Sequence, residues 1–274
     1  MDIKAIVMKV AAIQLASSPD KGRNLEKALR FAEAAVQRGA EVLCFPELFP
    51  YPWFPSKVDE RAFSLAEPAD GPLISEFCEF SKREGVSLIV PFFEREGGNF
   101  YNSAAVISGG ELMGLYRKVH LPEIPLWEER FYFSPGDNFP VFALNGVKIG
   151  IQMSWDSLFP EGPRILALKG AEVLFVPSAC AFRTQQRWLK LLAGHAISNG
   201  LFVVRVNRVG EEPHQHFYGM SFFLDPEGEL ILEPAGLEEG ILLGEILPEE
   251  ARRVRTKWCL FKDRRPDLYR GISS

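Results

Sequence analysis

Short apolar runs alternate along this chain with segments whose apolar residues recur at helical spacing. The runs from Lys9 to Ala16 and from Glu41 to Pro46 predict strands, because each is short and continuously apolar. Between them, residues Asn24 to Arg38 place apolar side chains on one helical face, and Gly39 ends that helix. The chain therefore begins with a predicted strand, helix and strand.

The same alternation continues to about residue 248. Further helices are predicted at Gly71 to Glu84, near Pro163 to Gly170, and at Thr184 to Asn199. Further strands are predicted at Val86 to Phe93, Ala104 to Lys118, Val141 to Ser154, Glu172 to Pro177, Leu201 to Asn207, Met220 to Leu224, Glu229 to Leu232 and Ile241 to Ile246. The second and third of these runs each read as two strands, which turn at Gly109-Gly110 and Asn145-Gly146. The Asp225-Pro226-Glu227-Gly228 turn joins the strands on either side of it.

Helices that alternate with strands predict an α/β layer architecture, and the hairpins make the sheet mixed rather than purely parallel. No low-complexity linker interrupts the pattern, so one domain is expected over residues 8–248. Residues 249–274 form a C-terminal arm rich in Arg and Lys. We interpret this arm as a solvated or oligomer-packing segment rather than a nucleic-acid patch.

Composition narrows the function classes. A hydrophobic content of 47% and a net charge of −5 are ordinary for a globular protein and argue against a nucleic-acid binder. The four cysteines form no CxxC pair, so no disulfide framework and no zinc site is expected, and a reducing cytoplasm is the simplest location. No apolar run of about 18 residues predicts a membrane span. The His214-Gln215-His216 cluster lacks further ligands at suitable spacing, so no metal or cofactor is expected.

Candidate chemistry lies where predicted strands end, because ligands of open α/β sheets bind beyond the carboxyl ends of the strands. Glu47 follows a buried strand and has apolar and proline neighbours, so it is a candidate general base, with a surface glutamate as the alternative. Lys118 ends another strand and is a candidate to stabilise an oxyanion, with a solvated strand end as the alternative.

A third candidate is Ser154, where an apolar run breaks at a small polar residue and enters a turn toward a helix. This is the geometry of a nucleophile elbow, in which a sharp turn exposes a side chain. The flanking residues do not form G-x-S-x-G, and no histidine lies in a Ser–His–acid order. His195 falls in mid-helix, where histidines are mostly structural.

The sequence motifs of three separated segments are more specific evidence of a protein family than any of these residues alone. The segments are 45–49 (FPELF), 116–123 (YRKVHLPE) and 150–161 (GIQMSWDSLFPE). In this order they resemble the nitrilase superfamily of carbon–nitrogen hydrolases, as do 129–137, 167–179 and 207–210. The resemblance spans about Met8 to Leu247. It implies a four-layer αββα sandwich with two mixed sheets, and assembly into homodimers or larger homo-oligomers.

The resemblance also implies roles for individual residues. Glu47 occupies the position of the general base, Lys118 that of the residue that stabilises the tetrahedral intermediate, and Ser154 that of the family's cysteine nucleophile. Glu129 matches a second glutamate that orients Lys118 or the substrate, although the adjacent Glu128 fits nearly as well. The backbone N–H of Trp155 would contribute to the oxyanion site.

Serine at position 154 departs from the family pattern. A thiolate is a strong nucleophile near neutral pH, whereas a hydroxyl needs a stronger base than a carboxylate, so serine predicts a severe loss of turnover. Three explanations are open: a cysteine-to-serine change made to inactivate the enzyme, a natural pseudoenzyme that binds small molecules, or true serine chemistry. The intact Glu47 and Lys118 favour the first.

Within the superfamily, the segments look closest to the N-carbamoyl and aliphatic amidase branches, and the nitrilase branch is the alternative. The expected reaction is hydrolysis of a small linear amide or N-carbamoyl amine, with release of ammonia. The pocket wall is predicted to include Tyr51, Trp53, Trp155, Ala179 and Phe182, although core packing is the alternative for each of them.

Overall fold

Two mixed sheets form the centre of the protein in a computed structural model that describes residues 6–181 and 185–272. The larger sheet has the strand order β15-β1-β2-β3-β4-β5. Its strands are β1 (Met8–Gln14), β2 (Val42–Cys44), β3 (Ser87–Glu96), β4 (Asn99–Ser108), β5 (Glu111–Arg117) and β15 (Gly240–Ile246). Strands β1, β2 and β3 run parallel, and the other neighbours are antiparallel.

The smaller sheet has the order β14-β11-β10-β9-β8. Its strands are β8 (Val141–Leu144), β9 (Val147–Ile151), β10 (Val173–Ser178), β11 (Phe202–Asn207) and β14 (Phe222–Leu224). Strands β9, β10 and β11 are parallel, while β8 and β14 pair antiparallel at the two edges. The prediction of mixed sheets is therefore confirmed for both sheets.

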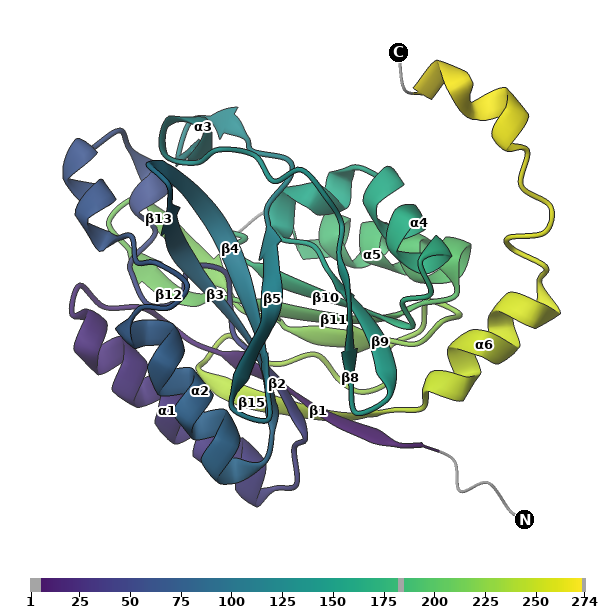
Figure 1. The fold of residues 1–274 in the computed structure, drawn as a ribbon, viewed down its shortest axis with the longest axis horizontal. Helices are drawn as coiled ribbons and strands as arrows, with labels where there is room; N and C mark the ends of the chain where they lie inside the picture. The colour runs from purple at the N-terminus through teal and green to yellow at the C-terminus, as the bar shows by residue number, and fades with distance from the viewer. Residues whose placement is uncertain (1–5, 182–184, 273–274) are drawn as a thin grey trace.

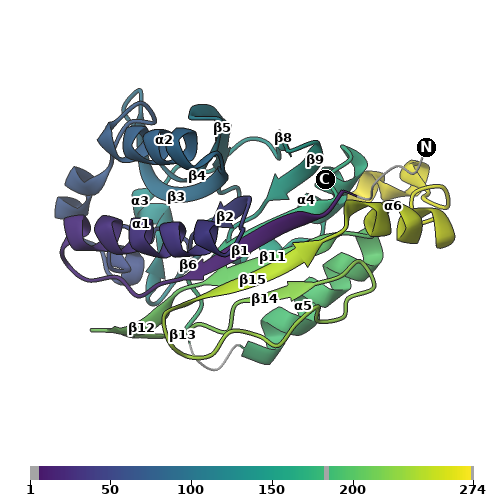
Figure 2. The same ribbon diagram turned by 90° about the horizontal axis from the view of Figure 1, so that it is seen from below.

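Helices cover the outer face of each sheet, which gives four layers (Figures 1 and 2). Helices α1 (Lys21–Gln37) and α2 (Pro72–Glu84) pack on the larger sheet, and α4 (Glu161–Leu168) and α5 (Gln185–Asn199) pack on the smaller one. Helix α1 begins at an N-cap aspartate, Asp20, whose side chain accepts a hydrogen bond from the Arg23 N–H. Helix α2 ends at Gly85, which adopts the left-handed conformation typical of a C-cap.

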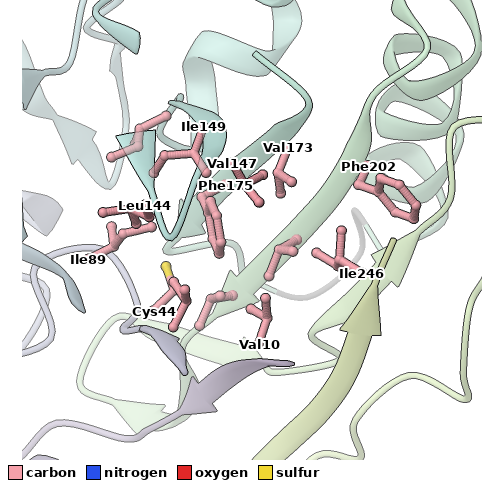
Figure 3. Packing of buried hydrophobic residues seen from close by; sticks show 14 of the residues in the cluster. Val10, Cys44, Ile89, Leu144, Val147, Ile149, Val173, Phe175, Phe202 and Ile246 are labelled. Atoms are coloured by element: carbon pink, nitrogen blue, oxygen red, sulfur yellow. The ribbon is translucent and has the colours of Figure 1, made fainter. Parts of the chain in front are cut away.

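Successive side chains of a strand point to opposite faces of the sheet, so each sheet has a hydrophobic core on both faces. In β10, Val173 and Phe175 face the other sheet, whereas Leu174 and Val176 face α4 and α5. Figure 3 shows Phe175 packed among residues from both sheets. Because both faces of the central strands are covered, their sequences are continuously apolar rather than alternating with polar residues.

Both predicted glycine turns are confirmed. Asn145 and Gly146 both have positive φ, at 51° and 80°, as the turn between β8 and β9 requires. The strand predicted at Glu229 to Leu232 is wrong, because only an isolated bridge pairs Leu230 with Leu224. The Asp225 side chain folds the backbone locally by accepting from the N–H groups of Glu227 and Glu229, and Pro234 soon follows.

Several short elements were not predicted from the sequence. They are β6 (Glu123–Ile124), β7 (Trp127–Glu128), α3 (Glu129–Tyr132), β12 (Val209–Glu212), β13 (Gln215–Tyr218), α6 (Pro248–Lys257) and the 3₁₀ turns η1 (Phe54–Ser56), η2 (Glu60–Leu65), η3 (Ser154–Leu158) and η4 (Pro266–Ile272). Helix α6 buries Ala251 and Val254 against the domain, and the chain beyond it curves away from the sheets (Figure 1). Within the described residues, no helix is long and apolar enough to cross a membrane.

Candidate active site

Glu47 lies on a tight turn just after β2 and is fully buried. Its Oε1 atom accepts hydrogen bonds from Asn102 Nδ2 and from Lys118 Nζ, both at 2.8 Å. Its Oε2 atom accepts a hydrogen bond from the Ser154 hydroxyl. A surface glutamate is therefore excluded, since every contact of this carboxylate points into the protein.

Lys118 follows β5, and two hydrogen bonds fix its backbone. Its N–H donates to the Asn102 carbonyl at 2.9 Å, and its carbonyl accepts from the Gly136 N–H at 2.8 Å. A Cβ atom at Gly136 would lie 2.2 Å from the carbonyl oxygen of Arg117, so this close approach requires glycine. The Lys118 side chain is 0% exposed, which excludes a solvated strand end.

Glu129, rather than Glu128, contacts Lys118. Both Glu129 carboxylate oxygens lie 2.7 Å from Lys118 Nζ, and Glu129 is fully buried at the start of α3, while Glu128 is half-buried in β7. Burial raises the pKa of Glu129 to about 8; the Lys118 charge opposes the rise and the Glu47 charge adds to it. Burial lowers the pKa of Lys118, but the charges of Glu129, Glu47 and Asp156 outweigh it and raise that pKa above its ordinary value. Lys118 therefore stays a cation between two carboxyl groups.

Ser154 opens η3 with a φ of 35°, in the left-handed region that a residue with a side chain rarely adopts. Such a conformation costs on the order of 1–3 kcal/mol and is characteristic of functional turns. The Asp156 carboxylate holds the turn, since it accepts from the N–H groups of Met153 and His120 and from the Tyr116 hydroxyl. The Ala179 N–H donates to the Ser154 hydroxyl oxygen at 2.9 Å. The elbow predicted at this position is therefore present.

His195 does not reach Ser154. Its Nε2 atom lies 2.7 Å from the Ser157 carbonyl oxygen, so it ties α5 to the backbone of η3. Burial lowers its pKa, in keeping with a neutral structural imidazole. Among the described residues, no group of three or more His, Cys, Asp or Glu side chains is placed to hold a metal ion.

A pocket of about 210 Å³ opens beside Ser154. Trp155 and Ala179 line it, together with Glu129, Cys180 and Arg187. Most of its remaining lining is apolar: Pro122, Ile124, Trp127, Leu158, Ala181 and Trp188. Its size suits a small ligand with few polar groups.

The other predicted wall residues lie elsewhere. Tyr51 and Trp53 line a neighbouring cavity, where the Tyr51 hydroxyl donates to the Leu65 carbonyl and Trp53 Nε1 donates to the Leu126 carbonyl. Both are buried in an aromatic cluster that also contains Phe93. Phe182 lies outside the described residues.

Three residues beside these groups were missed from the sequence. Asn102 fixes Glu47, Asp156 fixes the elbow, and Cys180 lines the pocket with its Sγ atom 3.9 Å from Ser154 Oγ. Asn102 and Cys180 stand in ordinary strand-like segments, so no local signal identifies them. Asp156 lies within the recognised segment 150–161, and its position two residues after Ser154 is the signal that was available.

Comparison with known proteins places this geometry in a family. The carbon-nitrogen hydrolase family model matches residues 9–256. The chain is 38% identical to the N-carbamoylputrescine amidase of Solanum tuberosum, over 97% of this chain and 95% of that protein. It is 35% identical to the citrullinase of Francisella tularensis, over 97% and 98% of the two chains.

A solved structure agrees with these sequence matches. The carbon-nitrogen hydrolase from Helicobacter pylori G27 superposes with a TM-score of 0.92 at 33% identity, and the match covers 98% of this chain and 99% of that one. A likeness over nearly the whole length of both chains concerns the architecture and not isolated motifs. The chain therefore belongs to the carbon-nitrogen hydrolases of the nitrilase superfamily, on the amidase side of that family.

Proposed function

We propose that this site hydrolyses the C–N bond of a small linear amide or N-carbamoyl amine through a covalent acyl-enzyme. The observation that carries the proposal is the buried lysine held between two carboxyl groups, one of which also contacts Ser154. Such a group supplies a base and an oxyanion partner at the wall of one pocket. The relatives named for N-carbamoylputrescine and citrulline support a ureido or amide substrate.

Each residue then has a definite role. Glu47 takes the proton of the nucleophile and later returns it to the leaving nitrogen, which departs as ammonia. Lys118 stabilises the tetrahedral oxyanion, together with the N–H of Trp155, because the first N–H groups of a helical turn have no partner within it. Glu129 orients Lys118 through its two hydrogen bonds. Water then attacks the acyl-enzyme, again with Glu47 as base.

The pocket limits the substrate. Its largely apolar walls include Trp155 and Ala179, which we propose contact the part of the substrate beyond the scissile bond. A volume of about 210 Å³ suits a small molecule. Tyr51 and Trp53 belong to the aromatic cluster, so any effect of theirs on substrate choice passes through the packing of that cluster.

Serine at the nucleophile position limits turnover in this proposal. A hydroxyl is a far weaker nucleophile than a thiolate at neutral pH, and Glu47 is its nearest base. We therefore expect Ser154→Cys to raise ammonia release from a panel of amides, ureido compounds and nitriles by roughly 10³-fold or more. The matched control is Ser154→Cys combined with Glu47→Gln, which keeps the thiol and removes the base. No ammonia from any compound with Ser154→Cys contradicts the proposal.

The alternative is a binding protein that keeps the pocket without turnover, and the serine itself favours it. Under this alternative, Ser154→Cys stays inactive, while the chain as it stands retains a small ligand that survives purification. Native mass spectrometry of the Ser154 protein, after exposure to a cell extract, measures that ligand directly. Retention of a ligand together with inactivity of Ser154→Cys favours the alternative.

We further propose one hydrolase domain over residues 8–248, and an arm over 249–274 that packs in a homo-oligomer. Support comes from the exposure of large apolar side chains in the arm, where Trp258 is 60% and Leu268 is 66% exposed. Contiguous exposed apolar groups are often covered by another protein surface. Helix α6, by contrast, already packs on its own domain through Ala251 and Val254.

A further inference from the structure

Cys180 places a thiol beside the position of the family nucleophile. Its Sγ atom lies 3.9 Å from Ser154 Oγ and faces the same pocket. It follows Ala179, whose N–H donates to the Ser154 hydroxyl oxygen. Reacting atoms in a productive complex stand about 3–3.5 Å apart, so a carbonyl carbon seated for attack by one of these side chains is within reach of the other.

The backbone at Cys180 is fixed by the neighbouring strand. The Cys180 N–H donates to Asn207 Oδ1 at 2.8 Å, and Asn207 Nδ2 donates back to the Cys180 carbonyl at 3.1 Å. Asn207 ends β11 and is fully buried. The thiol is thus held at the pocket wall by a rigid pair of hydrogen bonds, as a catalytic group requires.

A buried cation acts on this thiol. Arg205 of β11 is 1% exposed, and its charge lowers the pKa of the Cys180 thiol. Its Nη2 atom donates to the Tyr218 hydroxyl at 2.8 Å, whereas its Nε atom has no hydrogen-bond partner among the described residues. No carboxylate of the described residues forms an ion pair with it. A buried charge without a counterion is costly, and a thiolate at position 180 would supply one.

Ser154 connects the thiol to the base. The Ser154 hydroxyl accepts a hydrogen bond from the Ala179 N–H, donates one to Glu47, and lies 3.9 Å from the Cys180 sulfur. Burial raises the pKa of Cys180, and the neighbouring Arg205 lowers it only in part. The resting group is therefore a thiol, and its proton has a path through the Ser154 hydroxyl to Glu47.

We propose that Cys180 is the nucleophile of this chain, with Ser154 as the proton relay in place of the family's cysteine. This inference rests on the proposed function. The Cys180 sulfur attacks the carbonyl carbon while the thiol proton passes to Ser154 and the Ser154 proton passes to Glu47. The C–N bond breaks as Glu47 protonates the leaving nitrogen, which leaves a thioester on Cys180. Water then attacks the thioester and gives one proton to Glu47. The C–S bond breaks, and that proton returns through Ser154 to the thiolate.

Alkylation by 2-chloroacetamide, a small amide electrophile, tests the thiol independently of turnover. Peptide mass spectrometry measures the modification rate of each cysteine against that of the exposed Cys259. We expect Cys180 to react at least about tenfold faster than Cys259 at neutral pH, since activation offsets its burial. Glu47→Gln and Ser154→Ala each slow Cys180, and Arg205→Met moves the pH midpoint of its alkylation upward. A Cys180 rate at or below that of Cys259, or one that Glu47→Gln does not change, overturns the proposal.

Amide hydrolysis by the original chain and by a set of its variants separates this inference from the proposed function. We expect Cys180→Ala and Cys180→Ser to abolish the amide hydrolysis of the chain as it stands, while Ser154→Cys combined with Cys180→Ala remains active. Thermal unfolding checks that each variant folds, and Cys259→Ala serves as the matched control. Two results overturn this inference and leave the proposed function standing, both with an active Ser154→Cys variant. In the first, the Cys180 variants hydrolyse amides as well as the original chain does. In the second, the original chain hydrolyses no amide. If neither the original chain nor Ser154→Cys hydrolyses any amide, both fail.

Discussion

The lysine between two buried carboxyl groups makes a sharp prediction about stability. Replacing Lys118 with methionine keeps most of the aliphatic stem and removes the charge that lies 2.8 Å from Glu47 and 2.7 Å from Glu129. Because the pKa of Glu129 is raised to about 8, that group is largely neutral at pH 7, and Lys118 balances the other carboxylate. The variant therefore buries one negative charge without a partner unless it takes up an extra proton.

The free-energy cost of taking up that proton follows from the linkage between protonation and folding. Protonating a glutamate at pH 7 costs about 1.4 kcal/mol for each pH unit above its ordinary pKa of about 4.3, or roughly 3.5–4 kcal/mol. This agrees with the roughly 3–5 kcal/mol that breaking a buried ion pair costs. The carboxyl pKa is raised in the folded variant, so the folded state is favoured below the unfolded pKa and loses that advantage as pH rises. The loss in the free energy of unfolding, relative to the unmodified protein, therefore becomes smaller as the pH falls from 7 to 5.

Urea unfolding followed by tryptophan fluorescence at pH 7 and pH 5 measures this deficit. We expect Lys118→Met to lose about 3–4 kcal/mol at pH 7 and only about 1 kcal/mol at pH 5. The matched control adds Glu47→Gln, which removes the unpaired charge and restores most of the stability at pH 7. A loss below about 1 kcal/mol at pH 7, or an equal loss at both pH values, refutes the reasoning.

Two further predictions concern the elbow and the arm. Asp156→Asn replaces an oxygen that accepts several buried hydrogen bonds with an amide that donates, so we expect a loss of about 2–5 kcal/mol in urea unfolding and reduced activity in the Ser154→Cys background. An unchanged unfolding midpoint contradicts this. Removing residues 259–274 deletes a segment whose described part, residues 259–272, is mostly exposed, so we expect the oligomer to dissociate more readily in analytical ultracentrifugation while the thermal midpoint of the domain changes little. An unchanged sedimentation profile contradicts that role for the arm.

Local patterns predicted most of the fold. Continuous apolar runs became strands buried on both faces, and the Asn145-Gly146 pair became the turn between β8 and β9. The strand predicted at Glu229 to Leu232 failed because the Asp225 side chain holds its backbone in a local turn. Helix α6 was missed because its few buried residues depend on packing against the domain, which a short charged sequence does not reveal.

The sequence by itself determined the layers of this protein and the three segments that carry Glu47, Lys118 and Ser154. The periodicity of strands and helices and the sequence motifs are local properties of the chain. Only the tertiary structure decided that Glu129 rather than Glu128 meets Lys118, and that Cys180 lies beside Ser154. These contacts join residues from different strands and turns. Glu47 and Ser154 are 107 positions apart in the sequence, and only the packing of the two sheets brings their side chains together.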